Sequence, residues 1–256
     1  MKTTTLPADF QPKPDLLKDK VILVTGATGG FGRAMSRRYA DSGATVILLG
    51  KNIRRLEEVY DAIEEAGGPQ PAIYPMDLEG ATEKDYYDLA QNIDKEFGRL
   101  DGLLHAAAQL GAPTPFEHSD TETWYKVMQI NLNAPYLLTK HLIGLLRKSP
   151  HASVVFMTDD KPGTYWDAYM VSKGGIDQLT RLMAREYEGS PLFVNAVNPG
   201  MSRTGLHLRA FPARDGNDRL PMPEDHADLF LYLMSDDLNE QGRCFVPSGA
   251  EARQDT

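Results

Sequence analysis

Tyr169 and Lys173 are the residues whose types and spacing most directly suggest chemistry in this chain. Residues four apart on a helix project from one face about one turn apart, so both side chains could act on one substrate. A free tyrosine titrates near pH ~10, and a nearby ammonium lowers that pKa because it stabilises the phenolate. The pair is therefore a candidate general acid and base, which we favour over a surface pair because of the elements around it.

A strand, a glycine turn and a helix at residues 20–32, KVILVTGATGGFG, form the second candidate site. The apolar run at its start has the length of a strand buried on both faces of a parallel sheet. Gly26, Gly30 and Gly32 let the backbone turn tightly and approach a ligand. The helix start presents unpaired N–H groups and the positive end of its dipole, which suits a pyrophosphate. In this context we favour dinucleotide binding over an ordinary structural turn.

Buried apolar runs alternate with amphipathic segments along the rest of the chain. This alternation predicts an α/β fold: a single Rossmann-like, doubly wound parallel sheet of about seven strands with helices on both faces. A ligand crevice is expected at the carboxyl ends of the strands. The expected parts are an extended N-terminal arm at 1–18, a single domain at 19–249 with a substrate lid at 201–223, and a mobile tail at 250–256.

The composition argues against several classes of function. The formal net charge is -9 and no basic cluster is present, which argues against binding to nucleic acid. The single cysteine, Cys244, allows neither an intrachain disulfide nor a cysteine metal cluster, and no metal is expected. The first residues carry no apolar core of signal-peptide length, and no later stretch reaches the roughly 18 apolar residues of a membrane span. A cytoplasmic protein without a membrane partner is therefore expected.

The end of the second expected strand bears on the choice of cofactor. In dinucleotide folds an acidic side chain at this place binds the 2′-hydroxyl of NAD. Here the strand ends in Gly50 and Lys51 follows, and a cation without a carboxylate suits the 2′-phosphate of NADP. We therefore predict a preference for NADP(H), with Lys51 as a solvated charge at a helix start as the alternative.

Four motifs together resemble the short-chain dehydrogenase/reductase family. They are T-G-x-x-x-G-x-G at 25–32, the first asparagine of INLN at 130–133, Tyr-x-x-x-Lys at 169–173, and Asn-Pro-Gly at 198–200 followed by Thr204. The resemblance covers nearly the whole chain. A Pro-rich arm leading into DLLKDKVILVTGA, with VILLGKN and RLDGLLHAAA, is similar to a bacterial YciK-like branch of this family.

The resemblance implies hydride transfer between a nicotinamide and a carbonyl or alcohol. Tyr169 would be the general acid or base, Lys173 would bind the nicotinamide ribose and lower the tyrosine pKa, and Asn131 would hold a water of the proton relay. Family members pair equivalent helices, which implies a homodimer or homotetramer. The implied cofactor contacts are Thr25, Gly26, Thr28, Gly30, Phe31, Gly32, Lys51, Asp77, Leu78, Ala106, Ala107, Tyr169, Lys173, Pro199, Gly200 and Thr204. Asp77 could equally be a helix N-cap.

Two segments depart from the family's pattern. HAAA at 105–108 stands where the family usually has Asn-Asn-Ala-Gly. TDD at 158–160 stands where the family has Ser-Ser, whose hydroxyl donates a hydrogen bond to the substrate oxygen. Neighbours on a strand face opposite ways, so either Thr158, as a replacement hydroxyl, or Asp159 points inward. An ionised aspartate only accepts hydrogen bonds, would repel a forming oxyanion, and would compete with Tyr169 for the charge of Lys173.

The leading hypothesis is an NADP-dependent oxidoreductase, specifically a carbonyl reductase for a small or medium organic molecule. The alternative is a catalytically impaired dinucleotide-binding protein that acts as a sensor or assembly partner, because the usual serine is absent. The candidate catalytic residues are Asn131, Thr158, Tyr169 and Lys173. The lid side chains that could line the pocket, or equally cover exposed core, are His207, Leu208, Phe211 and Arg214.

Overall fold

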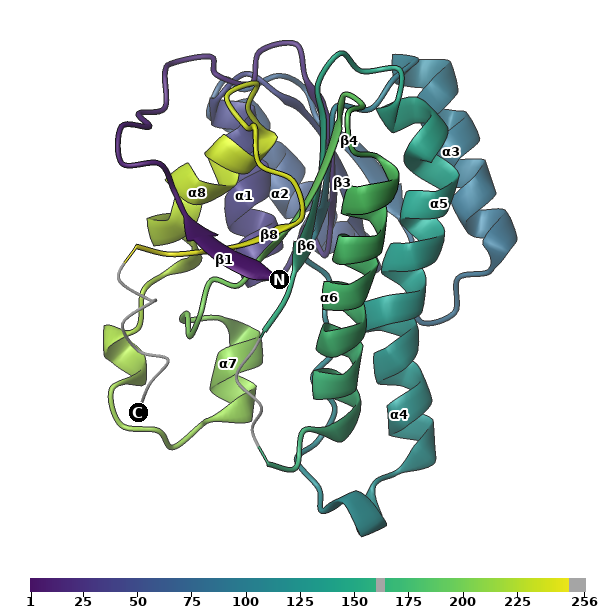
Figure 1. The fold of residues 1–256 in the computed structure, drawn as a ribbon, viewed down its shortest axis with the longest axis vertical. Coiled ribbons are helices and arrows are strands. Elements are labelled where there is room, and N and C mark those ends of the chain that lie inside the picture. The colour runs from purple at the N-terminus through teal and green to yellow at the C-terminus, as the bar shows by residue number, and fades with distance from the viewer. Residues whose placement is uncertain (160–163, 249–256) are drawn as a thin grey trace.

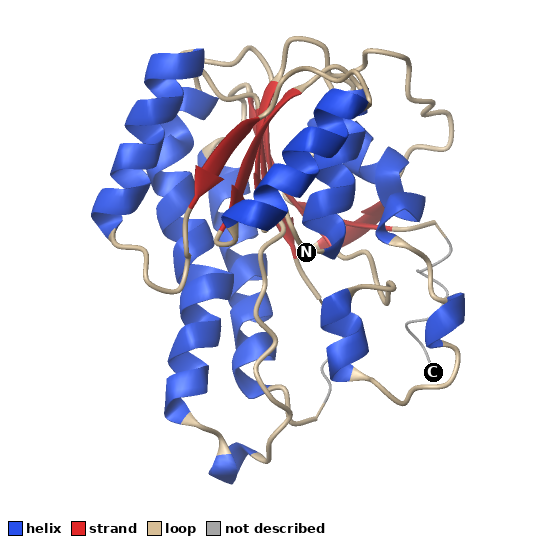
Figure 2. Ribbon diagram, turned by 180° about the vertical axis from the view of Figure 1, so that it is seen from behind, coloured by secondary structure: helices blue, strands red, loops and turns tan. Residues whose placement is uncertain are grey.

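The computed structural model describes residues 1–159 and 164–248, which form one sheet with helices on both faces (Figures 1 and 2). The tail expected at 250–256 lies outside the described residues. Within these residues eight strands pair in parallel in the order β1-β8-β7-β6-β5-β2-β3-β4, one more than the seven or so expected, and the Rossmann-like architecture is confirmed. The strands are β1 (Lys2–Thr5), β2 (Val21–Thr25), β3 (Thr45–Gly50), β4 (Ala72–Pro75), β5 (Gly102–His105), β6 (Ala152–Met157), β7 (Leu192–Val197) and β8 (Arg243–Val246).

Helices cover the two faces of the sheet, and each face has its own apolar core. Ile22 and Val24 of β2 face the core under α1, α2 and α8, whereas Leu23 faces the core under α3, α5 and α6. This alternation along one strand is what the pleat of a sheet requires. No helix among the described residues is long and apolar enough to cross a membrane. The helices are α1 (Gly30–Asp41), α2 (Ile53–Glu65), α3 (Glu83–Phe97), α4 (Thr121–Met128), α5 (Ala134–Leu146), α6 (Asp167–Glu186), α7 (Gly205–Ala210) and α8 (Ala227–Met234).

The strand order reverses between β2 and β5. From β2 the chain runs outward through β3 to β4, and it then returns to β5 on the other side of β2. Thr25 is aligned with Leu49 of β3 and with His105 of β5, so the carboxyl ends of the three strands lie level. In open sheets of this type, ligands bind in the crevice outside such a reversal.

Part of the arm expected at 1–18 joins the sheet as the edge strand β1. It pairs in parallel with β8 along its whole length (Figure 1). Farther along the arm, Phe10 packs edge-on against Tyr232 with 5.2 Å between the ring centroids, and Leu17 is fully buried. The first residues thus extend the sheet and cover core side chains.

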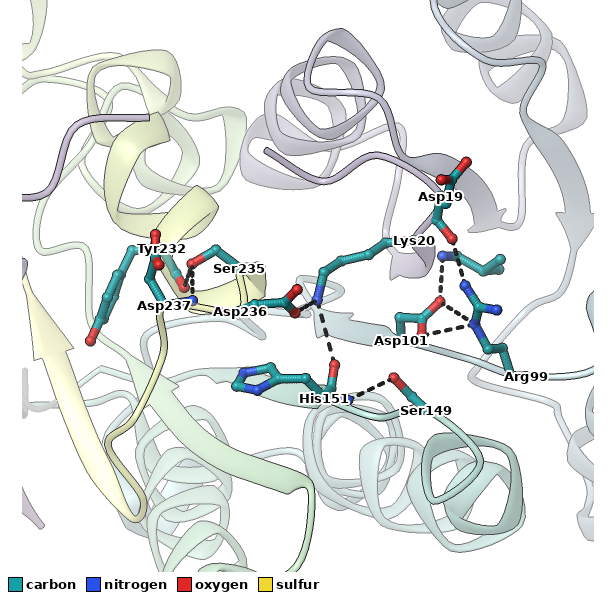
Figure 3. A network of polar contacts seen from close by, with 11 residues as sticks. Asp19, Lys20, Arg99, Asp101, Ser149, His151, Tyr232, Ser235, Asp236 and Asp237 are labelled. Atoms are coloured by element: carbon teal, nitrogen blue, oxygen red, sulfur yellow. Dashed lines mark hydrogen bonds and ion pairs between the residues drawn. The ribbon is translucent and has the colours of Figure 1, made fainter. Parts of the chain in front are cut away.

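Charged side chains connect the amino ends of the central strands (Figure 3). These ends lie opposite the carboxyl ends of the strands, where the crevice is expected. Asp101, just before β5 and only 3% exposed, accepts a hydrogen bond from the Val21 N–H of β2 at 2.9 Å. Nε of Arg99 lies 3.1 Å from both carboxylate oxygens of Asp101. Nζ of Lys20 donates to Asp236, which follows α8, at 2.6 Å. These contacts fix the places where β2 and β5 begin.

Replacing Asp101 with alanine would leave the Val21 N–H and the Arg99 guanidinium without this acceptor. A buried group that loses its hydrogen-bond partner keeps its desolvation cost, so we expect Asp101→Ala to lower the free energy of unfolding by about 2–3 kcal/mol. Urea denaturation followed by circular dichroism measures this change.

Asp94→Ala is the matched control, since Asp94 is 45% exposed and pairs with Lys148 at the surface. An exposed ion pair contributes about 0–1 kcal/mol. Equal destabilisation by the two substitutions would contradict the role assigned to Asp101.

Candidate active site

A cavity of about 760 Å³ opens at the carboxyl ends of the central strands. Its wall comes from the turn between β2 and α1, the loops that follow β3, β4, β5, β6 and β7, the first half of α6, and the segment around α7 that the sequence predicts to be a lid. One cavity therefore joins the glycine turn to the Tyr169–Lys173 pair. The predicted site residues in its wall are Gly26, Thr28, Gly30, Phe31, Lys51, Asp77, Leu78, Ala106, Ala107, Thr158, Tyr169, Lys173, Pro199, Gly200 and Thr204.

The turn between β2 and α1 is packed too closely for side chains. Gly26 has φ +63°, and a Cβ there would lie 2.8 Å from Cα of Ala107. A Cβ on Gly32 would lie 2.1 Å from the Gly26 carbonyl oxygen, and one on Gly30 would lie 2.7 Å from the methyl group of Thr204. The first turn of α1, with its unpaired N–H groups, therefore meets the cavity without a Cβ at Gly30.

Thr25 and Gly32, two predicted cofactor contacts, shape this turn and do not line the cavity. Thr25 is 1% exposed, and its Oγ1 accepts hydrogen bonds from the N–H groups of Ala106 and Ala107 at 3.1 and 3.2 Å. These bonds hold the loop after β5 against the end of β2. The small side chains of Ala106 and Ala107 leave the space beside the turn open.

His105 is a packing residue beneath the cavity. Its ring stacks on Phe156 with 4.7 Å between centroids, and its Nε2 lies 2.8 Å from Oγ1 of Thr139. Burial lowers the pKa of His105 to about 3, so the ring is neutral at physiological pH. In the part of the chain that the structure describes, no group of three His, Cys, Asp or Glu side chains could hold a metal ion.

Two cations stand at the end of the cavity beside β3. The strand ends at Gly50, and Lys51 and Arg55 follow in the cavity wall. Asn52 caps α2 by accepting the Arg55 N–H at 3.1 Å, which places Arg55 in the first turn of that helix. Our sequence reasoning missed Arg55, although its position four residues after Lys51 was an available signal.

Asp77 and Leu78 line the same end of the cavity. Oδ1 of Asp77 accepts the N–H of Glu79 at 3.1 Å and closes a turn. The N-cap of α3 is Thr82, so the alternative reading of Asp77 as the cap is wrong. Leu78 is buried and presents an apolar contact at this end.

Tyr169 and Lys173 lie on one face of α6, directly beyond the end of β6. Nζ of Lys173 donates to the carbonyl oxygen of Met157, the last residue of β6, at 2.8 Å. The same nitrogen lies 5.5 Å from the centroid of the Tyr169 ring. Both side chains are buried, so they meet the cavity in a place with restricted access to solvent.

Of Thr158 and Asp159, Asp159 contacts the phenol. Oη of Tyr169 donates to Oδ2 of Asp159 at 3.3 Å. Oγ1 of Thr158 donates instead to Oδ1 of Asp177, on α6, at 2.7 Å. In this structure the Thr158 hydroxyl is thus bonded to Asp177 and not to the phenol, because the extended backbone sends neighbouring side chains to opposite sides.

Asn131 connects the loop after β5 to α6 and does not line the cavity. It lies in a π-helical segment, Gln129–Asn133, between α4 and α5. Its Oδ1 accepts the Gln109 N–H at 2.8 Å, and its Nδ2 donates to the Gln109 carbonyl oxygen at 2.9 Å. The same Nδ2 donates to Oγ of Ser172 at 3.1 Å. Because Ser172 precedes Lys173, these bonds help to set the position of α6.

The loop after β7 brings the lid to the glycine turn. Oδ1 of Asn198 accepts the Gly200 N–H at 3.0 Å, and Gly200 has φ +69°. Thr204 caps α7 by accepting the His207 N–H at 3.1 Å. Since Thr204 also packs against Gly30, the start of α7 lies beside the start of α1.

The lid contributes aromatic and cationic side chains to the cavity wall. Phe211 lies edge-on to Trp166, with 6.4 Å between centroids, and so bridges the lid and the start of α6. The Arg214 guanidinium stands 5.8 Å from the centroid of the Phe211 ring. His207, Phe211 and Arg214 thus line the pocket, whereas Leu208 does not. Trp166, which the sequence reasoning missed, also lines it.

A family model described as short chain dehydrogenase matches residues 20–214. This span includes the glycine turn, Asn131 and the Tyr169–Lys173 pair. The chain belongs to the short chain dehydrogenase family. It is 42% identical over 231 residues to the oxidoreductase YciK of Escherichia coli strain K12, which covers 89% of this chain and 91% of that protein. The expected similarity to the YciK-like branch is confirmed.

Two solved structures of short chain dehydrogenases have the same fold. One, from Shigella flexneri 2a strain 301 and complexed with NADP, has a TM-score of 0.88 and 41% identity, over 91% of this chain and 99% of that chain. The other, from Escherichia coli CFT073 and complexed with NADPH, has a TM-score of 0.89 and 42% identity, over 92% and 99% of the two chains.

The pKa values of the pair in this short chain dehydrogenase are set first by burial. Burial raises the pKa of the Tyr169 phenol well above its ordinary value, and the charge and hydrogen bond of Asp159 raise it further. Burial lowers the pKa of Lys173 to about 8, against the carboxylates of Asp159 and Asp177, which raise it. The sequence reasoning predicted a lowered tyrosine pKa. That direction is wrong for this structure, because burial and Asp159 both raise the pKa of the phenol.

Removing the charge of Asp159 should lower the pKa of Lys173 below about 8, because the carboxylate stabilises the ammonium against burial. A pH titration of the lysine side-chain carbons by NMR measures this shift in Asp159→Asn, with Lys173→Arg to identify the resonance. Asp61→Asn, on the exposed face of α2, is the control and should leave the titration unchanged. A Lys173 pKa that rises or stays constant in Asp159→Asn would contradict this electrostatic account.

Proposed function

We propose that this chain is an NADP(H)-dependent oxidoreductase that transfers a hydride between the nicotinamide and a carbonyl or alcohol substrate, with Tyr169 as the general acid or base. The observation that carries the proposal is a single cavity that has the glycine turn at one side, Lys51 and Arg55 at one end, and the Tyr169–Lys173 pair in its wall. The NADP and NADPH complexes of two similar short chain dehydrogenases support the choice of cofactor.

The residues of the cavity fit a phosphorylated dinucleotide. Without Cβ atoms, Gly26 and Gly30 pack closely against Ala107 and Thr204 and line the cavity at the start of α1. Unpaired N–H groups and the helix dipole there favour an anion such as a pyrophosphate. Lys51 and Arg55 would hold the 2′-phosphate, since both side chains are cationic and both lie in the wall beyond Gly50. Pro199, Gly200 and Thr204 would contact the nicotinamide end.

When bound, the cofactor supplies the hydride that adds to the carbonyl carbon, or accepts it in the reverse direction. Tyr169 donates its phenolic proton to the carbonyl oxygen, so the C=O group gains one hydrogen at carbon and one at oxygen. Lys173 would hold the nicotinamide ribose with its buried ammonium. The raised pKa of Tyr169 keeps the phenol protonated at neutral pH, so its proton is available to a carbonyl oxygen.

A second candidate function is a dinucleotide-binding sensor or assembly protein with impaired catalysis. It is favoured by one observation: Asp159 offers the phenol a carboxylate where the family has a hydroxyl donor.

We also propose a cytoplasmic location and a homodimer or homotetramer. The exposed Tyr136 of α5, and Val171 and Leu182 of α6, support an assembly through these two helices.

Tyr169→Phe should lower kcat/KM for carbonyl reduction by roughly 10²- to 10⁴-fold, because it removes the proton donor, and should leave the affinity for NADPH within a factor of about two. Oxidation of NADPH against a panel of aldehydes and ketones measures the rate, and fluorescence titration measures the binding. Tyr87→Phe is the control at an exposed tyrosine of α3 and should behave as the unmodified protein. Tight NADPH binding without turnover in any of the three proteins would favour the sensor.

Lys51→Ala and Arg55→Ala should each weaken NADP binding by roughly 10- to 100-fold and leave NAD binding nearly unchanged, because each removes a charged hydrogen-bond donor to the phosphate that only NADP carries. Isothermal titration calorimetry with both nucleotides measures the two affinities. Arg54→Ala is the control, since Arg54 is exposed and outside the cavity wall. Tighter binding of NAD than of NADP by the unmodified protein would refute the assignment.

A further inference from the structure

Asp159 places a hydrogen-bond acceptor next to the reacting group of the proposed site. It is partly exposed in the cavity wall, and its Oδ2 accepts the Tyr169 hydroxyl at 3.3 Å. An ionised carboxylate has no proton to donate. The substrate subsite beside the phenol therefore contains a donor, Tyr169, and an acceptor, Asp159, in place of two donors.

The phenol has one proton, and reduction requires it to face the substrate. When Tyr169 turns that proton to a carbonyl oxygen, Oδ2 of Asp159 loses the donor that it holds in this structure. A carbonyl oxygen cannot replace that donor, because both atoms only accept hydrogen bonds. A simple ketone or aldehyde therefore binds with one hydrogen bond gained at Tyr169 and one lost at Asp159.

We propose that Asp159 is a specificity-determining residue that selects carbonyl substrates with a hydroxyl group on the neighbouring carbon, that is, α-hydroxy aldehydes and ketones. Such a hydroxyl can donate to Oδ2 of Asp159 while the adjacent carbonyl oxygen accepts from Tyr169, since Oη of Tyr169 and Oδ2 of Asp159 lie only 3.3 Å apart. This inference rests on the proposed reductase function and names its substrate class.

The polar side chains near Asp159 form their hydrogen bonds away from the subsite beside the phenol. Thr158 directs its hydroxyl to Asp177, and Lys173 directs its ammonium to the Met157 carbonyl oxygen. Asn131 is held by Gln109 and Ser172 away from the cavity wall. Asp159 and Tyr169 both line the cavity, and the hydrogen bond between their side chains can open to a substrate.

The reaction is balanced without a proton on Asp159. The carbonyl carbon gains the hydride, the carbonyl oxygen gains the Tyr169 proton, and the product is a 1,2-diol. The substrate hydroxyl keeps its proton and only shares it with the carboxylate. Asp159 therefore acts by binding, and its removal should change substrate preference more than the rate of the preferred chemical step.

The test compares matched ketones that differ only in the α-hydroxyl: acetoin with 2-butanone, and 2-hydroxyacetophenone with acetophenone, each reduced by the full chain with NADPH. The unmodified protein should show a kcat/KM ratio of roughly tenfold or more in favour of the hydroxyketone, because its hydroxyl restores the charged hydrogen bond that Asp159 loses when the phenol turns to the carbonyl oxygen. Asp159→Ser, which returns the family's hydroxyl, and Asp159→Asn, which adds an amide donor, should bring the ratio near one, chiefly by improving the plain ketone.

Asp61→Ser, on the exposed face of α2, should leave the ratio as in the unmodified protein. An unchanged ratio in both Asp159 variants, with turnover present, overturns the inference and leaves the reductase function standing. A preference of the unmodified protein for the plain ketones also overturns it. NADPH binding with no turnover of any ketone by any variant overturns the reductase function and this inference together.

Discussion

The cavity depends on a close approach of two backbone segments at the point where the strand order reverses. Gly26 meets the chain at Ala107, and the Thr25 hydroxyl fixes that contact by binding the N–H groups of Ala106 and Ala107. A side chain at Gly26 would push the loop after β5 away from the start of α1. Because this small area lacks side chains, the first turn of α1 and the helix that carries Tyr169 and Lys173 border one cavity.

The chemical character of the site follows from burial combined with an unusual carboxylate. Burial raises the pKa of Tyr169 and lowers that of Lys173, and Asp159 raises both. The phenol is thus held as a proton donor that already has an acceptor. In a family whose site normally offers a hydroxyl here, we propose that this acceptor changes which hydrogen-bonding groups a substrate needs. The proposal accounts for both candidate functions, because a site that is poor for simple ketones can still suit hydroxylated ones.

Local sequence patterns predicted the elements that depend on local physics. The apolar run of β2, the glycine turn and the shared face of Tyr169 and Lys173 follow from residue size and helical period. Features set by distant partners were not predictable in this way. The polar segment Lys2–Thr5 becomes a strand only because β8 offers an edge, and Arg55 reaches the cavity because of the cap of α2. The alternation of side chains along a strand could not decide whether Thr158 or Asp159 points toward the phenol, since that choice depends on an acceptor on α6, Asp177.

A crystal structure of the protein with NADPH bound tests this account most directly. We expect the pyrophosphate at the start of α1, the 2′-phosphate against Lys51 and Arg55, and the nicotinamide beside the Tyr169 phenol. Asp159 should still face the phenol. We also expect Lys173 within hydrogen-bond distance, about 3 Å, of the nicotinamide ribose. A nicotinamide out of reach of the phenol, or a nucleotide bound away from the glycine turn, would contradict the account.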